Sequence, residues 1–423
     1  MDAYDVSIML YNLCLIPVVF FSIIFFLMAV TRVAMRKNFE KHSKAVLKAK
    51  TLEKTPFVTV MVPVYNDLIA LRCLKHCLNL DYPKNRYEIM VLDDSSNESI
   101  ANALKAFSQK HGLIYIHRDN RQGYKPGALQ VGMKKAKGEV IVIFDSDWIP
   151  PKNFLKKILK PMINDPKVAI VQARQDFLNM NKNIVSRFAG FLLMVFHSVM
   201  MPLYNKINTV YFCGTGGALK REAIEKVGGW NAKSLTEDAD LSVKLLMQGY
   251  KTVYIPLKVK SEVPEKIEDF IKQQMRWTYG WVRVLCENFR KVWRSKKLSI
   301  AQKLAITFNG GASVGYPFVV LMTFFGMLGW FVGEPQPFKI KDLATFIARF
   351  SVSSGFLIAG FVTLKSEGKV KEFGKLALST IVMGLVLAVF NSLAVVLAFA
   401  NKKLLWYRTP KVGDKYAKQY VKQ

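Results

Sequence analysis

The sequence predicts an α/β protein with a mainly parallel sheet, flanked by helices and joined to a region of α-helical transmembrane segments. Three observations predict this fold class. Strand-like and helix-like segments alternate between residues 57 and 144, three long stretches carry no charge, and polar residues follow three of the expected strands. A chain of 423 residues has room for one large globular domain beside the membrane segments.

The alternation defines the expected elements of the sheet. Helices of about ten residues between apolar strands are typical of βαβ units, which form parallel sheets. The expected strands cover residues 57–66, 87–92, 113–117 and 139–144, and the expected helices cover 68–80, 99–110 and 126–137.

Polar residues follow three of these strands, and ligands of parallel sheets bind beyond the carboxyl ends of the strands. The three groups are Tyr65-Asn66-Asp67, Asp93-Asp94 and Asp145-Ser146-Asp147. Any one of them could be ordinary loop chemistry, but three at one edge favour a site. Two carboxylates at positions i and i+2 suit Mg²⁺ or Mn²⁺, and such a metal with open positions suits a diphosphate.

The uncharged stretches at residues 6–30, 304–332 and 376–400 are long enough to cross a bilayer. A fourth, 343–364, is interrupted only by Arg349. Asp2 and Asp5 precede the first stretch and basic residues follow it, which is unlike a cleaved signal peptide and predicts a cytosolic domain. The apolar residues 188–204 predict a helix at the membrane interface or under the active site, because a crossing there would separate Asp145 from Asp238.

Charge and cysteine content narrow the possible partners and the cellular compartment. The net charge of +30 suits anionic membrane lipids and a diphosphate substrate. The sequence has no basic stripe interleaved with aromatic residues, the pattern that would indicate binding of nucleic acid. The five cysteines show no disulfide spacing, as expected in a reducing cytosol. A metal site at Cys73, His76 and Cys77 is an alternative, but buried thiols on a helix face are the better interpretation.

Two further motifs lie in the second half of the soluble region. Gly214-Thr215-Gly216-Gly217 gives a backbone that can approach a ligand closely. Thr236-Glu237-Asp238 precedes an expected helix at 239–248, and Thr236 is a candidate N-cap. Its two acids could also simply satisfy the helix dipole.

Together these motifs resemble the membrane-embedded members of glycosyltransferase family 2, and among them the cellulose synthase-like group of cellulose, hyaluronan and mannan synthases. The resemblance spans residues 57–277 and rests on the order of its elements. These are Pro63-Val64-Tyr65-Asn66, Asp93-Asp94, Gly123-Tyr124-Lys125-Pro126-Gly127-Ala128-Leu129, Asp145-Ser146-Asp147, Gln172-Ala173-Arg174, Phe212-Cys213-Gly214-Thr215-Gly216-Gly217, Thr236-Glu237-Asp238, and Gln273 with Arg276-Trp277.

The resemblance implies a GT-A fold and an inverting transfer from a nucleotide-diphosphate sugar with Mn²⁺ or Mg²⁺. It implies Asp238 as the catalytic base, Asp145 and Asp147 as metal ligands, and Gln172, Arg174 and Gln273 as further motif residues. The donor-binding residues would be Pro63, Tyr65, Asp67, Asp94, Lys125, Asp145 and Arg276. The acceptor-binding residues would be Cys213, Gly214, Thr215, Glu237 and Trp277.

Two positions depart from the family pattern. Asn97 stands where the family often carries a further Asp, which affects nucleotide recognition. Gln175 follows Gln172-Ala173-Arg174 where mannan synthase-like members usually continue with Trp, which affects the acceptor contacts.

The expected organisation is a transmembrane helix (1–31), a basic linker (32–56), a cytosolic catalytic domain with interfacial helices (57–299), C-terminal transmembrane or interfacial helices (300–401) and a basic tail (402–423). Four spans would leave the lysine-rich tail outside, against the charge rule. Its segment 406–411 also resembles a cytosolic motif of related synthases. We therefore expect one segment to be interfacial and the tail to be cytosolic.

The acceptor divides the functional alternatives. Three or four spans are fewer than a polymer path usually needs, so the sequence favours transfer of one hexose to a lipid-linked oligosaccharide or glycolipid at the cytosolic face of a membrane. A processive polysaccharide synthase and an inactive scaffolding subunit are the alternatives. Likeness to mannan synthases through Gln172-Ala173-Arg174 favours GDP-mannose as the donor, with a UDP-hexose as the alternative.

Overall fold

The computed structural model describes residues 1–47, 52, 54–333 and 354–411. Its strands are β1 (Val58–Val64), β2 (Tyr87–Asp93), β3 (Ile114–His117), β4 (Val140–Ile143), β5 (Val168–Phe177), β6 (Gly217–Lys220) and β7 (Lys251–Ser261). Its helices are α1 (Ala3–Ala34), α2 (Arg36–Leu47), α3 (Ala70–Leu78), α4 (Glu98–Lys110), α5 (Tyr124–Lys135), α6 (Phe154–Asn164), α7 (Ile184–Val195), α8 (Met201–Lys206), α9 (Arg221–Lys226), α10 (Glu237–Met247), α11 (Ile267–Arg294), α12 (Ile300–Gly311), α13 (Gly315–Val332), α15 (Gly355–Ser366) and α16 (Phe373–Phe399).

The strands form one mixed sheet in the order β3-β2-β1-β4-β6-β5-β7. The four strands expected from the alternation pair in parallel, with Val64 opposite Asp93 and Met61 opposite Ile143. Their carboxyl ends therefore meet at one edge, as predicted. The sequence reading missed β5, β6 and β7, and β6 runs antiparallel to both of its neighbours.

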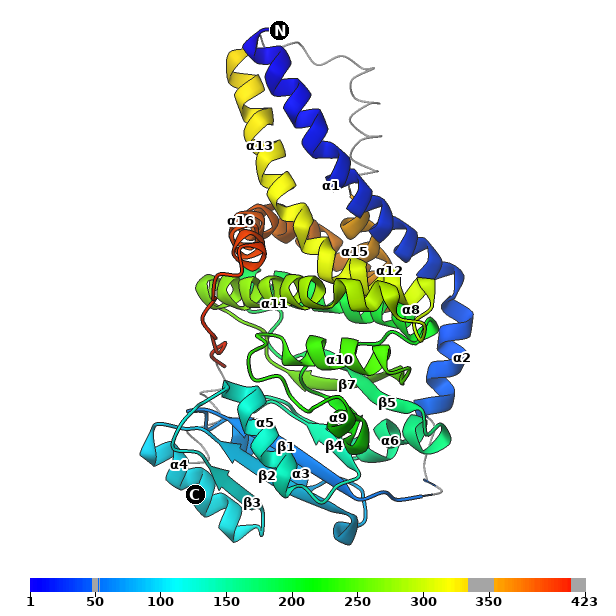
Figure 1. Ribbon diagram of the computed structural model, residues 1–423, viewed down its shortest axis with the longest axis vertical. Helices are drawn as coiled ribbons and strands as arrows, with labels where there is room; N and C mark the ends of the chain where they lie inside the picture. Colours follow the sequence, from blue (N-terminus) through cyan, green and yellow to red (C-terminus); the bar gives the residue numbers. More distant parts are fainter. Residues whose placement is uncertain (48–51, 53, 334–353, 412–423) are drawn as a thin grey trace.

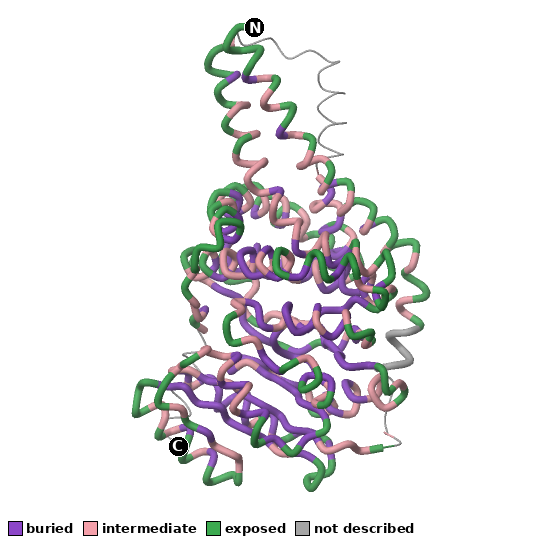
Figure 2. Tube along the Cα trace, in the orientation of Figure 1, coloured by how far each residue is buried: buried purple, intermediate pink, exposed green. Residues whose placement is uncertain are grey.

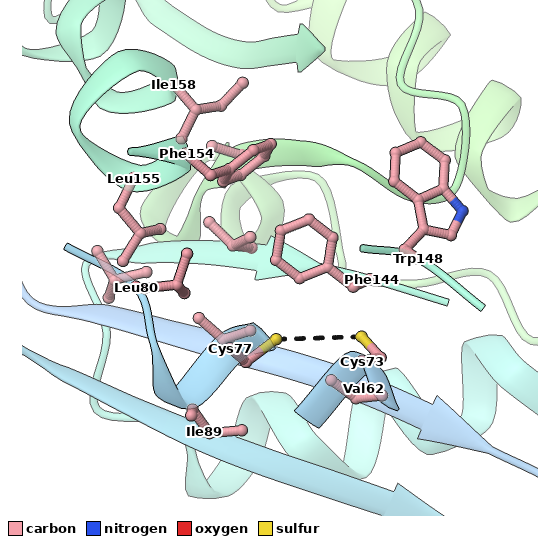
Figure 3. Close-up of a cluster of buried hydrophobic side chains, with 14 of the residues drawn as sticks. Val62, Cys73, Cys77, Leu80, Ile89, Phe144, Trp148, Phe154, Leu155 and Ile158 are labelled. Carbon is pink, nitrogen blue, oxygen red and sulfur yellow. Dashed lines mark hydrogen bonds between the residues drawn. The ribbon is translucent and has the colours of Figure 1, made fainter. Parts of the chain in front are cut away.

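Both faces of the sheet are covered by helices. Alternate residues of β1 point to opposite faces, so Val60 and Val62 pack under α3 and α6 while Met61 packs under α5. Figure 3 shows the first of these cores, with Cys73 and Cys77 among its aliphatic and aromatic side chains. The two sulfurs are buried and lie 4.0 Å apart, as expected from the interpretation of Cys73 and Cys77 as buried thiols.

The apolar helices extend away from this domain. Figure 1 shows α1 and α13 running side by side along the long axis, while α8 and α11 cross that axis between them and the sheet. Three glycines of α13 allow the close approach, since a Cβ on Gly315, Gly326 or Gly329 would lie 3.1–3.3 Å from side chains of α1. The outer surfaces of this pair are largely exposed, in contrast to the buried sheet (Figure 2).

Four helical stretches in the described residues are long and apolar enough to cross a membrane: Ala3–Ala34, Ile184–Lys206, Ile300–Val332 and Val370–Phe399. Three of these stretches cover the spans predicted at 6–30, 304–332 and 376–400, apart from residue 400. Ile184–Lys206 holds the segment expected at the interface; a π-helical turn, Phe196–Met200, interrupts it, and most of it is buried inside the protein. The predicted segment 343–364 lies partly outside the described residues, and α15 covers its remainder.

The glycine motif serves packing as well as the site. Gly216 has a φ of +63°, and a Cβ there would lie 2.1 Å from the ring of Trp148, which is 2% exposed. The backbone N–H of Gly216 donates to the carbonyl of Ile143 at the end of β4. Only glycine satisfies both the backbone conformation and this contact.

Gly216→Ala should therefore lower the unfolding temperature of the detergent-purified protein. The left-handed conformation alone costs a non-glycine residue about 1–3 kcal/mol, and the clash with Trp148 adds to that cost. Gly228→Ala is the matched control, because its φ is +88° and nothing lies within 4 Å of the added Cβ. Equal losses in the two variants would contradict the role of Trp148.

Candidate active site

A cavity of about 200 Å³ lies beyond the carboxyl ends of the strands, between the sheet and α11. Its wall contains most of the residues singled out from the sequence, which come from separate motifs along the chain. They are Pro63, Tyr65, Asp67, Asp94, Lys125, Asp145, Cys213, Gly214, Thr215, Glu237, Asp238, Gln273, Arg276 and Trp277.

Lys125 joins three of these motifs. It lies in the first turn of α5, after Gly123 in the left-handed conformation, and its Nζ donates to Asp145 Oδ1 at 2.7 Å and to the carbonyl of Gly214 at 3.0 Å. Glu237 Oε1 lies 3.9 Å from the same Nζ. Burial opposes the charge of Lys125, but the carboxylates outweigh it and raise its pKa.

Glu237 and Asp238 begin α10. Burial, followed by the charge of Asp238, raises the pKa of Glu237 to about 7, and burial also raises the pKa of Asp238. Asp238 Oδ1 accepts from the backbone N–H of Ala239 at 2.9 Å. A partly buried carboxylate with a raised pKa is a stronger proton acceptor than one in water, which suits a general base.

Thr236 occupies the N-cap position of α10, as predicted. The side-chain hydrogen bond typical of such a cap is absent, and the buried hydroxyl has no partner. The side chain lies instead against α11, where a Cβ on Gly280 would be 2.3 Å from Thr236 Cγ2. Packing against a neighbouring helix has overridden the local capping preference.

The two aspartates of the D-x-D motif lie in different environments. Asp145 is part of the cavity wall. Asp147 is fully buried behind it; its Oδ2 accepts from the backbone N–H of Glu262 at 2.8 Å, while its Oδ1 has no hydrogen-bond partner. A buried, unsatisfied carboxylate oxygen beside a second carboxylate fits a divalent cation. The described residues contain no group of three or more His, Cys, Asp and Glu that could hold a metal.

Asp94 has a partner that the sequence reading missed. Arg118 binds it through two hydrogen bonds, of 2.6 Å to Oδ1 and 2.5 Å to Oδ2, and also donates to the carbonyls of Gln122 and Tyr124. Asp94 thus reaches the cavity as half of a neutral pair, and Arg118 fixes the loop that leads into α5. No sequence spacing singles out Arg118 among the many basic residues.

Gln172 and Arg174 do not line the cavity, although the motif suggested a place at the site. Gln172 Oε1 accepts from the N–H of Cys213 at 3.0 Å, and its Nε2 donates to the carbonyl of Thr215 at 3.0 Å. It therefore holds the glycine-rich loop in position. Arg174 pairs with Glu367, beyond the end of α15, at 2.6 Å and ties the sheet to the apolar helices.

The segment after α16 returns to the cavity and contributes part of its wall. Trp406 stacks on Tyr124 with ring centroids 5.5 Å apart, and the guanidinium of Arg276 lies 4.7 Å from the Trp406 ring centroid. Arg408 donates to the carbonyl of Tyr65, and Lys411 Nζ lies 3.1 Å from Asp147 Oδ2. This segment therefore packs against the sheet domain.

Glu237→Gln should change the dependence of stability on pH. A carboxyl whose pKa rises from 4.5 to about 7 on folding contributes stability below its unfolded pKa, and that stability is lost as pH rises through the folded pKa. Because the amide does not titrate, the stability of the variant relative to the unmodified chain should increase from about pH 5 to about pH 8.

Thermal unfolding of metal-free, detergent-purified protein at both pH values measures this difference. Glu225→Gln is the control, since that carboxylate is 54% exposed on α9. A Glu237→Gln advantage that is equal at both pH values, or that shrinks as pH rises, would contradict the assigned burial.

Comparison with known proteins is consistent with this geometry. Residues 140–399, more than half of the chain, match the model of glycosyl transferase family group 2. The chain is 33% identical over 269 residues to a probable glucomannan 4-beta-mannosyltransferase 10 of Arabidopsis thaliana, covering 61% of this chain and 49% of that protein. It is 28% identical over 292 residues to glucomannan 4-beta-mannosyltransferase 1 of Cyamopsis tetragonoloba, covering 66% of this chain and 56% of that protein.

Among solved structures, a mannosyltransferase from Pyrobaculum calidifontis, in complex with GDP-Man and Mn²⁺, matches 90% of this chain and 100% of that chain, with a TM-score of 0.60 at 19% identity. This likeness confirms the predicted GT-A type of fold. The chain spans about half the length of the relatives from plants. The chain also carries long apolar helices. Because the family model matches more than half of its length, the chain belongs to glycosyl transferase family group 2.

Proposed function

We propose that this protein transfers mannosyl units from GDP-mannose to a polysaccharide acceptor at a membrane surface, with inversion at the anomeric carbon. The observation that carries the proposal is the convergence of Asp145, Lys125, Asp238 and Arg276 on one cavity. The glucomannan mannosyltransferases among its relatives support mannose and a polysaccharide. They favour this acceptor over the lipid-linked acceptor that the number of spans suggested.

The chemistry follows from the positions of the side chains. The carboxylate of Asp238 would take the proton of an acceptor hydroxyl as its oxygen bonds to the anomeric carbon. The bond from that carbon to the diphosphate oxygen breaks, and its electron pair leaves with the nucleoside diphosphate. Lys125 and Arg276 would stabilise the charge that develops on this leaving group, and the planar guanidinium suits two phosphate oxygens.

The residues present fit a divalent cation held by Asp145 and Asp147 together with the diphosphate. When bound, Mn²⁺ or Mg²⁺ would supply positive charge next to the leaving group. Trp277, in the cavity wall, offers a flat apolar surface on which a sugar of the acceptor can rest.

The returning segment would enclose the donor. Arg408 and Lys411 bring two positive charges to this edge of the sheet. Arg408 Nη2 lies 3.4 Å from Asp67 Oδ2, and Lys411 Nζ lies 3.1 Å from Asp147 Oδ2. Charges of this sign attract a diphosphate, so the segment would bind more tightly when the donor is present.

A second candidate is the transfer of a single hexose to a lipid-linked oligosaccharide or glycolipid. It is favoured by the small number of helices in the described residues that are apolar enough to cross a membrane. In both cases we propose that residues 57–299 form the catalytic domain on the cytosolic face.

The length of the product distinguishes the two candidates. Protein in native membranes is incubated with radiolabelled GDP-mannose and Mn²⁺, and the products are separated by solvent extraction and size. Ethanol-insoluble material that β-mannanase degrades supports the polysaccharide proposal. Label found only in the lipid extract, one sugar per acceptor, would replace it with the second candidate.

Asp238→Asn should reduce transfer by at least the 10²–10⁴-fold typical of a general base, because the amide cannot take the acceptor proton. Binding of GDP should stay within a few-fold of that of the unmodified protein, as measured by calorimetry, because Asp238 acts on the acceptor. Collapse of GDP binding would show that the residue serves the donor instead.

Asp147→Ala should abolish the strengthening of GDP binding by Mn²⁺, because the variant lacks the buried oxygen available to the cation. GDP titrations with and without Mn²⁺ measure the effect. Asp81→Ala is the control, since that carboxylate is 59% exposed outside the cavity. A Mn²⁺ effect of unchanged size in Asp147→Ala would rule out the metal assignment.

A further inference from the structure

A second cavity lies at the junction of α1, α2 and α8, apart from the active site. Its volume is about 290 Å³, and its wall combines basic and amide side chains with apolar ones. Arg32, Lys206 and Asn38 provide the polar part, and Phe39 and Leu203 belong to the apolar part. None of the residues that line it is acidic.

The guanidinium of Arg32 is held in place at this cavity. Its Nε donates to the carbonyl of Ser198 at 2.8 Å, and its central carbon lies 4.5 Å from the ring centroid of Phe39. Phe39 stacks in turn on Tyr254 of β7, with centroids 6.5 Å apart. An arginine fixed by one nitrogen and one aromatic face loses little entropy when its other nitrogens bind a ligand.

The nearest acid on α2 has another partner. Glu40 accepts from Arg36 at 2.7 Å, and both side chains are largely exposed. Glu40 contributes to the electrostatic surroundings of Arg32 but does not line the cavity. Arg32 and Lys206 therefore give the cavity wall two positive charges, and an anionic group is the complementary ligand.

The position of the cavity suggests where this anion comes from. Arg32 lies in the last turn of α1, between the exposed apolar residues Val30 and Val33 and the basic helix α2. On α11, the indole of Trp293 is partly exposed, as is typical of membrane interfaces. Figure 1 shows this junction at the end of α1 that meets α8, beyond the part of α1 that runs beside α13.

We propose that this cavity binds the phosphate headgroup of an anionic phospholipid from the leaflet that faces the catalytic domain. Arg32 and Lys206 contact the phosphate oxygens, because a guanidinium fork and an ammonium both donate to them. Leu203 accepts the glycerol and the first methylenes of the acyl chains, while Phe39 holds the guanidinium of Arg32 in place. The bound lipid fixes the height of α1 and α8 relative to the membrane and does not depend on the proposed transfer reaction.

Native mass spectrometry of the full chain, released from nanodiscs of phosphatidylcholine with phosphatidylglycerol, tests the proposal. The unmodified protein should retain phosphatidylglycerol several-fold more than phosphatidylcholine. Arg32→Gln and Lys206→Gln should each lose most of this preference. Lys206 is exposed, so its variant tests the site even if Arg32→Gln disturbs the contact with Ser198.

Lys37→Gln is the matched control, since this exposed lysine of α2 does not line the cavity. Retention of the preference in Lys37→Gln supports a defined site, whereas an equal loss there would overturn it in favour of diffuse charge attraction. Added inorganic phosphate separates the two sources of the anion. Displacement of the lipid by low phosphate concentrations would show a free-anion site and overturn the lipid assignment.

Discussion

The contacts of the partly buried ammonium of Lys125 are the interactions on which the site depends. Three carboxylates from two distant motifs, Asp145, Glu237 and Asp238, act on it electrostatically within one cavity. Carboxylates brought together in a partly dry space repel one another, and one cation among them offsets much of that cost. The same cation also holds the glycine-rich loop through the carbonyl of Gly214. A donor diphosphate would add negative charge, and the positive groups of α11 and of the returning segment lie where they can compensate for it.

Connections between the sheet and the apolar helices set the position of this centre. Arg174 and Lys258, on neighbouring strands, both bind Glu367 beyond α15, at 2.6 and 2.7 Å. On the other side, α11 carries Gln273 and Arg276 into the cavity while it packs against α16 through Val282 and its neighbours. A membrane surface along α8 and α11 would thus lie directly above the reaction centre, which suits an acceptor that stays bound to the membrane.

Local patterns predicted the first half of the fold well, because each βαβ unit is encoded by adjacent residues and the carboxyl ends of its strands share one edge. They failed for β5, β6 and β7, and β6 is a strand of four residues whose antiparallel direction depends on its neighbours β4 and β5. The glycine motif indicated a close approach to a ligand, whereas the close approach at Gly216 is to the buried ring of Trp148. Arg118 could not be singled out, because its partners become known only from the folded chain, and the segment 406–411 was noticed without its contacts to the cavity. The N-cap position of Thr236 was predicted correctly, but the loss of its capping hydrogen bond could not be, because the side chain packs against Gly280 on another helix.

The central claim is that this cavity activates a nucleotide sugar, and release of nucleoside diphosphate by the detergent-purified protein tests it most directly. The protein is supplied in turn with GDP-mannose, UDP-glucose and UDP-N-acetylglucosamine, with Mn²⁺ and with a chelator, in the presence of membrane lipid extract and a short mannan. The account predicts release of GDP from GDP-mannose that the chelator abolishes. Release from a UDP-sugar alone would contradict the donor, and no release from any of the three donors would contradict the enzymatic role.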